Sequence, residues 1–175
     1  MKNNTRKLTQ AAMIAGLYAA VTFATFYMSF GAVQYRISEA LTILPVFTAS
    51  AVPGLSIGCA LANLIGYFMG VNPVGGFDAV FGTAATLIAA LITYRIGKSQ
   101  KRWVRYVFAP LPPVIANAVI IGLEICIVSA GKVTWELFFI HAALVGLGEL
   151  VVCYVLGLPL MYVLERNDLY KRIFK

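Results

Sequence analysis

The longest uncharged stretch of the chain, residues 40–77, reads ALTILPVFTASAVPGLSIGCALANLIGYFMGVNPVGGF. A membrane-spanning helix needs about 20 mostly apolar residues, so this stretch is too long for one span and long enough for two short ones. Proline removes a backbone donor and glycine permits a turn. Pro53 and Gly54 therefore predict a break between a helix over 38–52 and a helix over 54–70, and Asn-Pro-Val-Gly-Gly at 72–76 predicts the next loop.

The composition of the whole chain points to the same environment. Of its 175 residues, 61% are apolar and only 12% are charged, and the mean hydropathy is +0.84. A soluble domain has nearer 45–50% apolar and about 25% charged residues and cannot hide so much apolar surface from water. The composition excludes a water-soluble globule, a disordered chain, a disulfide scaffold and a self-contained nucleic-acid module. It predicts a multi-pass protein of the cell membrane, surrounded by membrane lipid.

Charged residues mark the ends of the other predicted spans. The uncharged stretch at 8–35 predicts a first helix over 8–30, and it is about twice as long as the apolar region of a signal peptide. The remaining helices are expected over 77–96, 106–130 and 137–165, the fifth with an irregular start at Pro110, Pro112 and Pro113. We therefore predict an all-α membrane protein with six transmembrane helices in a single integral membrane domain, 1–175.

The distribution of cations predicts the orientation. If the N-terminus is inside, the inner segments hold 12 of the 14 Lys and Arg residues, and only Arg36 and Lys132 lie outside. Such a bias over short loops is the positive-inside signal, so both termini are predicted to be cytoplasmic. This topology also explains the net charge of +7 without a nucleic-acid partner.

Small residues recur along the first predicted helix at a spacing of four. Because four residues make about one turn, two neighbouring lines form one smooth face that another backbone can approach closely. That neighbour is either another helix of this chain or a partner protein, and the spacing does not decide between them. The two lines are Ala11, Ala15 and Ala19, and Ala12, Gly16 and Ala20.

Ionisable residues at membrane depth indicate a binding site. An unpaired charge at the bilayer centre costs at least about 2.5–3.5 kcal/mol, so Glu124 and Glu149 are predicted to line a polar pocket that opens outward. The alternative is an internal hydrogen-bonded network that ties the helices together. The other candidates share a helix face with these residues or with each other, or lie on the outer side: Asn117, Asn63, Tyr67, Arg36, Glu39, Asp78 and His141.

Signatures of catalysis and nucleotide binding are missing from the sequence. Gly97-Lys98-Ser99 resembles the end of a phosphate loop, but that motif needs a glycine where Ile92 stands. There is no Ser/His/Asp set, and His141 has no companions for a metal site. We predict no enzyme activity, no cofactor and no bound metal. Energy from ATP would have to come from another subunit.

Two segments carry a resemblance to a known family. Residues 35–45, YRISEALTILP, and residues 75–83, GGFDAVFGT, are similar to the QueT family, the substrate-binding S-components of energy-coupling factor (ECF) transporters. The resemblance extends over nearly the whole chain. It implies a six-helix protein that binds a queuosine precursor, a 7-deazaguanine-type base, on its outer side. It also implies partners, namely an ECF coupling transmembrane subunit, contacted by Ala11, Ala15 and Ala19, and two cytoplasmic ATPase subunits.

The candidate residues suit such a ligand. A guanine-like base presents a ring N–H beside an amino group, and one carboxylate can accept both hydrogen bonds. An aminomethyl substituent adds a cation that favours a second acidic group. Two alternatives stay open: an S-component for another vitamin-like molecule, and an autonomous proton-coupled carrier that uses Glu124 and Glu149 as a relay.

Overall fold

The computed structural model describes residues 2–29, 35–72, 76–166 and 168–174, and this part of the chain forms helices and no strand. The end of the first predicted helix at residue 30 and the middle of the predicted loop at 73–75 lie outside the described residues. The elements are α1 (Lys2–Ala24), α2 (Phe26–Ser29), η1 (Ile37–Val46), α3 (Ala51–Phe68), α4 (Phe77–Gly97), α5 (Arg102–Phe108), α6 (Leu111–Ala130), α7 (Trp135–Val151), η2 (Val152–Gly157), α8 (Leu158–Arg166) and α9 (Leu169–Phe174).

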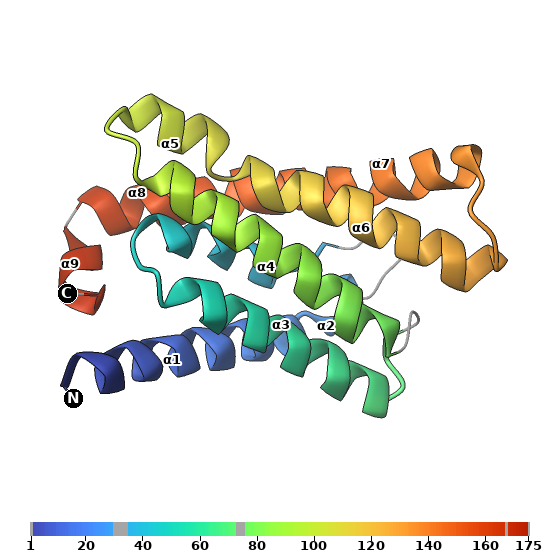
Figure 1. Ribbon diagram of the computed structural model, residues 1–175, viewed down its shortest axis with the longest axis horizontal. Helices are drawn as coiled ribbons and strands as arrows, with labels where there is room; N and C mark the ends of the chain where they lie inside the picture. The colour runs from blue at the N-terminus through green and yellow to red at the C-terminus, as the bar shows by residue number, and fades with distance from the viewer. Residues whose placement is uncertain (1, 30–34, 73–75, 167, 175) are drawn as a thin grey trace.

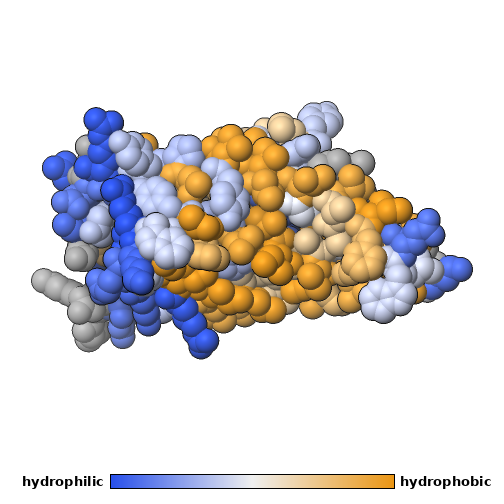
Figure 2. Space-filling view, turned by 90° about the horizontal axis from the view of Figure 1, so that it is seen from above, coloured by the Kyte–Doolittle hydropathy of each residue, from blue (hydrophilic) through white to orange (hydrophobic). Residues whose placement is uncertain are grey.

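The long helices run along the long axis of the molecule (Figure 1); α1 and α3 run in the same direction, with the short η1 returning between them, and α4, α6 and α7 then alternate in direction. Both chain termini lie at the same end, together with α5 and α9. Figure 2 shows a broad apolar belt between two hydrophilic ends, of which the end that carries the termini is the larger. This surface is that of a multi-pass membrane protein, with the bundle axis across the bilayer. Which end faces the cytoplasm stays a prediction from the cation distribution.

Among the described residues, four helical stretches are long and apolar enough to cross a membrane. They are α3, α4, the stretch Arg102–Ser129 through α5 and α6, and the stretch Trp135–Arg166 through α7, η2 and α8. Helix α1 has 23 residues, about 34 Å of helix, and packs along α3. It is not among the four, because its first turns are polar.

The predicted second span over 38–52 is wrong. The chain there forms η1, a 3-10 helix of ten residues that ends at Val46, and a rise of 2.0 Å per residue gives it a length of about 20 Å. Pro45 lacks the N–H that an α-helical bond to Leu41 requires. Pro53 was expected to break the chain, but it lies in the first turn of α3, where its missing N–H has no intrahelical partner to lose.

The last two spans are interrupted at prolines. Ala109 and Pro110 separate α5 from α6, which confirms the irregular start expected for the fifth helix. In the final span, residues 152–157 form the π-helix η2. Pro159 has no N–H for the carbonyl of Val155, so the regular ladder is interrupted here.

Helices α1 and α3 approach each other at two glycines of α3. A Cβ on Gly54 would lie 2.8 Å from the backbone oxygen of Ala11, and a Cβ on Gly58 would lie 2.9 Å from that of Ala15. Only glycine permits backbones so close. This contact places the inner face of α1, including Tyr18, deep in the bundle.

Candidate functional site

A buried ion pair joins the starts of two helices. Arg36, the residue before η1, donates from Nη2 to Oδ2 of Asp78 in the first turn of α4 at 3.1 Å, and the two side chains are 4% and 1% exposed. Asn72 Nδ2 donates to the same Oδ2 at 3.0 Å, and Asn63 Nδ2 donates to the backbone oxygen of Asp78 at 2.8 Å. Asp78 is therefore held by residues from three segments.

Glu39 forms a second centre beside this ion pair. Its carboxylate accepts a hydrogen bond from the hydroxyl of Tyr18 on α1, and both side chains are fully buried. The backbone oxygen of Glu39 accepts from Thr42 Oγ1 at 2.5 Å and from Cys153 Sγ, in η2, at 3.8 Å. The two irregular helices thus meet at this residue.

Two further carboxylates approach from the other side of the bundle. Glu149 on α7 accepts from Cys153 Sγ at 3.7 Å and interacts electrostatically with Glu39 and Arg36. Glu124 on α6 is 1% exposed and interacts electrostatically with Asp78 and Arg36. We call these side chains the buried polar cluster: Tyr18, Arg36, Glu39, Asn63, Asn72, Asp78, Asn117, Glu124 and Glu149.

The buried polar cluster contains side-chain atoms that have no hydrogen-bond partner within the described part of the chain. They include both carboxylate oxygens of Glu124, Oε2 of Glu39, Oδ1 of Asp78, Oδ1 of Asn63 and Nδ2 of Asn117. Each such atom costs about 1–3 kcal/mol when it is buried without a partner. Five of these six atoms are acceptors and one is a donor, so the cluster is suited to a molecule that brings mainly donors.

The structure brings together seven of the nine residues proposed for the ligand site. The other two lie apart: Tyr67 is 50% exposed, although Asn63 on the same helix is buried, and His141 is half-buried on α7. Neither of these two hydrogen-bonds to the buried polar cluster within the described residues. Their side chains therefore do not belong to the buried polar cluster.

Sequence reasoning missed Tyr18 and Asn72. A tyrosine at membrane depth carries a hydroxyl that needs a partner, and Tyr18 stands seven and three residues after the buried Ala11 and Ala15, on the same side of α1. That periodicity was an available signal. Asn72 was assigned to a loop, and only the three-dimensional structure shows that it reaches Asp78.

Comparison with known proteins identifies the family. The family model described as QueT transporter matches residues 8–166. The chain belongs to the QueT transporter family. No curated protein and no solved structure matches it.

Membership of the QueT family defines the general role. The chain is an ECF-type S-component, the subunit that binds a small substrate within a membrane transporter, and S-components of this family work with ECF module partners. The family is one of transporters. In this setting the buried polar cluster is the candidate substrate site of a QueT protein.

The predicted partner face of α1 has two different environments. Ala11 and Ala15 are 7% and 4% exposed and contact the glycines of α3, so this chain itself covers them. Ala19 is partly buried against the same core. The other line is exposed at all three positions, Ala12, Gly16 and Ala20, and a Cβ on Gly16 would meet nothing within 4 Å.

Proposed function

We propose that this QueT protein binds a queuosine precursor, a 7-deazaguanine-type base, in the buried polar cluster. Import of the base is driven by ATP hydrolysed on two cytoplasmic ATPase subunits and transmitted by the coupling transmembrane subunit. The observation that carries the proposal is the excess of buried acceptor atoms without partners, of which Glu124 supplies two.

The hydrogen-bonding groups of such a base complement these atoms. A deazaguanine presents a ring N–H beside an amino group, and a carboxylate accepts both at once, as it does from an arginine fork. Glu124 is the carboxylate assigned to this edge. Asn117 Nδ2, which lies near the carboxylate of Glu149 without satisfying it at normal hydrogen-bond geometry, is assigned to the carbonyl of the base, and Asn63 Oδ1 to a further N–H.

The charges of the cluster favour a precursor with an ammonium arm. Four carboxyl groups, those of Glu39, Asp78, Glu124 and Glu149, face a single guanidinium, that of Arg36. Uncompensated charge is costly away from water, so a cation is more favourable here than a neutral group. Glu149, near Glu39, is assigned to the ammonium.

Binding requires the bundle to open. Every residue of the buried polar cluster is at most 7% exposed, so this conformation is closed to solvent. The 3-10 helix η1 carries Glu39 and follows Arg36 directly, and it is too short to cross the bilayer. We propose that movement of η1 away from α4 admits the ligand.

The coupling subunit is proposed to contact the exposed line Ala12, Gly16 and Ala20. Small side chains permit close helix approach in lipid, where packing rather than hydrophobicity drives helix association. Ala19 lies at the edge of this surface. The buried line with Ala11 and Ala15 is already occupied by α3.

The proposal is tested by calorimetry on the purified full chain. The ligands are a neutral deazaguanine base, the same base with an aminomethyl arm, and an unrelated vitamin such as thiamine or riboflavin. We expect both bases to bind and the cationic base to bind more tightly. Binding of a vitamin but of neither base would assign the chain to another substrate.

Uptake into liposomes tests the need for partners. We expect uptake only when the coupling subunit and both ATPases are reconstituted with this chain and ATP is present. Uptake by the chain alone, driven by a proton gradient, would support the autonomous carrier instead. A catalytically inactive ATPase variant in the same complex is the matched control.

A further inference from the structure

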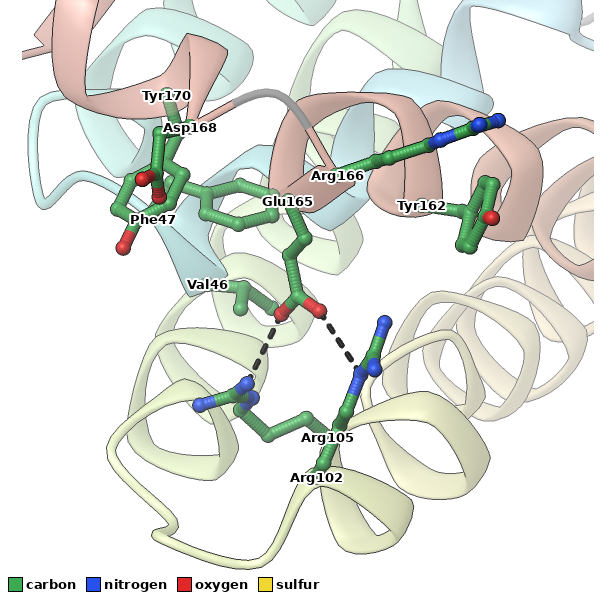
Figure 3. A pocket seen from close by; sticks show the side chains of 9 residues that line it. All are labelled: Val46, Phe47, Arg102, Arg105, Tyr162, Glu165, Arg166, Asp168 and Tyr170. Atoms are coloured by element: carbon green, nitrogen blue, oxygen red, sulfur yellow. Dashed lines mark hydrogen bonds and ion pairs between the residues drawn. The ribbon is translucent and has the colours of Figure 1, made fainter.

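A cavity of about 580 Å³ lies at the end of the bundle that carries the chain termini (Figure 3). Residues of η1, α5, α8 and α9 line it, and none of them belongs to the buried polar cluster. Its volume is within the range of about 300–1,000 Å³ that small-molecule sites occupy. The cavity is therefore separate from the proposed substrate site.

Glu165 fixes two arginines at this cavity. Arg105 Nη2 lies 2.9 Å from its Oε1, and Arg102 Nε lies 3.2 Å from its Oε2 (Figure 3). The hydroxyl of Tyr106 also donates to Oε2, at 3.1 Å. Both oxygens of the carboxylate are thus in use, and the two guanidinium groups are held from opposite ends of the same carboxylate.

Positive charge exceeds negative charge in the lining. Arg166 adds a third guanidinium, which lies 6.0 Å from the centre of the Tyr162 ring and forms no ion pair with a described residue. Asp168 is paired with Lys171 at 2.9 Å. The Asp168–Lys171 pair carries no net charge. The three arginines and Glu165 together carry a net charge of +2. In addition, Arg105 Nε is buried without a hydrogen-bond partner among the described residues.

The surroundings of the cavity are those of a membrane–water interface. Trp103 and Val107 on α5 and Tyr162 and Val163 on α8 are exposed apolar or aromatic side chains. Aromatic residues are enriched at this depth of a bilayer, and arginine extends from it toward the headgroups. The guanidinium groups line the cavity itself, and these apolar side chains, of which Tyr162 also lines it, are exposed on the same two helices.

We propose that this cavity binds the phosphate of an anionic phospholipid, with the acyl chains along the exposed sides of α5 and α8. Guanidinium groups bind phosphate oxygens through paired, charge-assisted hydrogen bonds, and basic pockets between membrane helices recognise anionic headgroups. The apolar flank favours a lipid over a soluble phosphate. The site does not depend on the proposed substrate.

The test uses the full chain in nanodiscs of phosphatidylcholine with a rising fraction of phosphatidylglycerol. Native mass spectrometry measures the lipid that stays bound. We expect retention of phosphatidylglycerol over phosphatidylcholine and about fivefold weaker retention in Arg166→Gln, the loss of one cation near a membrane surface. Arg102→Gln, at a mostly exposed side chain, should also weaken retention. Arg166→Lys keeps the charge and should retain most of the affinity.

Lys98→Gln is the matched control, because it removes one charge at the same end but outside the cavity lining. It should leave retention within twofold of the native chain. Equal losses in Arg166→Gln and Lys98→Gln would overturn the proposal in favour of diffuse surface attraction. Inorganic phosphate or glycerol phosphate that binds in detergent as tightly as the lipid would overturn the lipid assignment and leave a soluble phosphate as the ligand.

Discussion

Arg36 and Asp78 form an ion pair at 3.1 Å inside the bundle, although 42 positions separate them in the chain. The pair fastens the start of η1 to the start of α4. Lipid is as apolar as the interior of the bundle, so apolar burial does little to position a short helix such as η1. Its place depends on polar contacts of this kind.

Removing one partner of this pair should destabilise the fold strongly. We expect Arg36→Met to lower the free energy of unfolding by about 3–5 kcal/mol, because it leaves the Asp78 charge buried without its partner. Unfolding in mixed micelles with increasing denaturant measures this loss. The double variant Arg36→Met/Asp78→Asn should recover part of it.

An exposed ion pair provides the control. Arg102 lies 3.2 Å from Glu165, but 62% of its side chain is exposed, so Arg102→Met should cost less than about 1 kcal/mol. Similar losses for Arg36→Met and Arg102→Met would show that the buried pair has no special role in stability.

Glu124→Gln should weaken binding of a deazaguanine base at least tenfold. The new amide places a donor against the donors of the ligand, and an unmade buried hydrogen bond costs about 1–3 kcal/mol. Glu149→Gln should weaken the aminomethyl base more than the neutral base. Calorimetry with both ligands measures these differences, and Glu136→Gln, at an exposed position of α7, is the control. Native affinity in folded Glu124→Gln would assign this residue to helix packing.

Gly82→Ala should impair the same site without a change of charge. A Cβ at this position would lie 2.6 Å from Asp78 Oδ1 and 2.8 Å from Asn63 Nδ2, so both side chains must move. We expect a loss of ligand affinity of about tenfold with helix content unchanged by circular dichroism. Gly16→Ala adds a methyl group where nothing lies within 4 Å and should keep native affinity. Equal affinity in the two variants would contradict the assignment of Asp78 and Asn63.

The two lines of small residues on α1 should respond differently to a leucine. Ala15→Leu overfills the contact with α3 and should cost about 1–3 kcal/mol of stability. Gly16→Leu should keep stability and ligand binding but lose co-purification with the coupling subunit and ATP-driven uptake. Pull-down and thermal unfolding of both variants separate these effects. A Gly16→Leu variant that still assembles and transports would place the coupling subunit on another surface.

Cysteine labelling of intact cells tests the orientation. Lys132 and Gln100 are exposed at opposite ends of the bundle, and the three native cysteines are buried. An impermeant maleimide should label Lys132→Cys and leave Gln100→Cys unlabelled until the cells are opened. Asn72, another outward position by sequence, is a poor labelling site because it is buried against Asp78. Labelling of position 100 from outside would reverse the orientation.

Helix ends that follow charged residues were predictable, and those that depend on prolines were less so. The fourth predicted helix, 77–96, differs from α4 by one residue, and the last, 137–165, is within two residues of the observed span at either end. The predicted second helix, 38–52, failed because a proline in the first turn of a helix is tolerated, whereas one further along is not. Pro45 and Pro53 look alike in the sequence. They differ in their distance from the start of their helices, which only the structure gives.

The burial of Glu124 and Glu149 was predictable, because a charge at membrane depth is expensive unless it is enclosed. Their role in ligand binding stays a prediction. Tyr67 shares a side of α3 with Asn63, but its side chain is 50% exposed, and periodicity alone does not show where along that side the bundle covers the helix. On α1, the spacing of small residues led us to treat the line with Ala11 and the line with Ala12 as one face. The two lines point about 100° apart around the helix, and tertiary packing decides which of them faces inward.

The arrangement of α1 also separates two kinds of inherited change. Tyr18 reaches Glu39 from the inner side of the helix, whereas Gly16, two positions earlier, faces outward with open space beside it. If the coupling subunit binds this outer side, as proposed, mutations there can follow the shape of whichever coupling subunit a cell provides, while the inner side with Tyr18 stays unchanged. On that proposal, a lineage with one shared coupling module and a lineage with a dedicated one need differ only at a few outward positions of this helix.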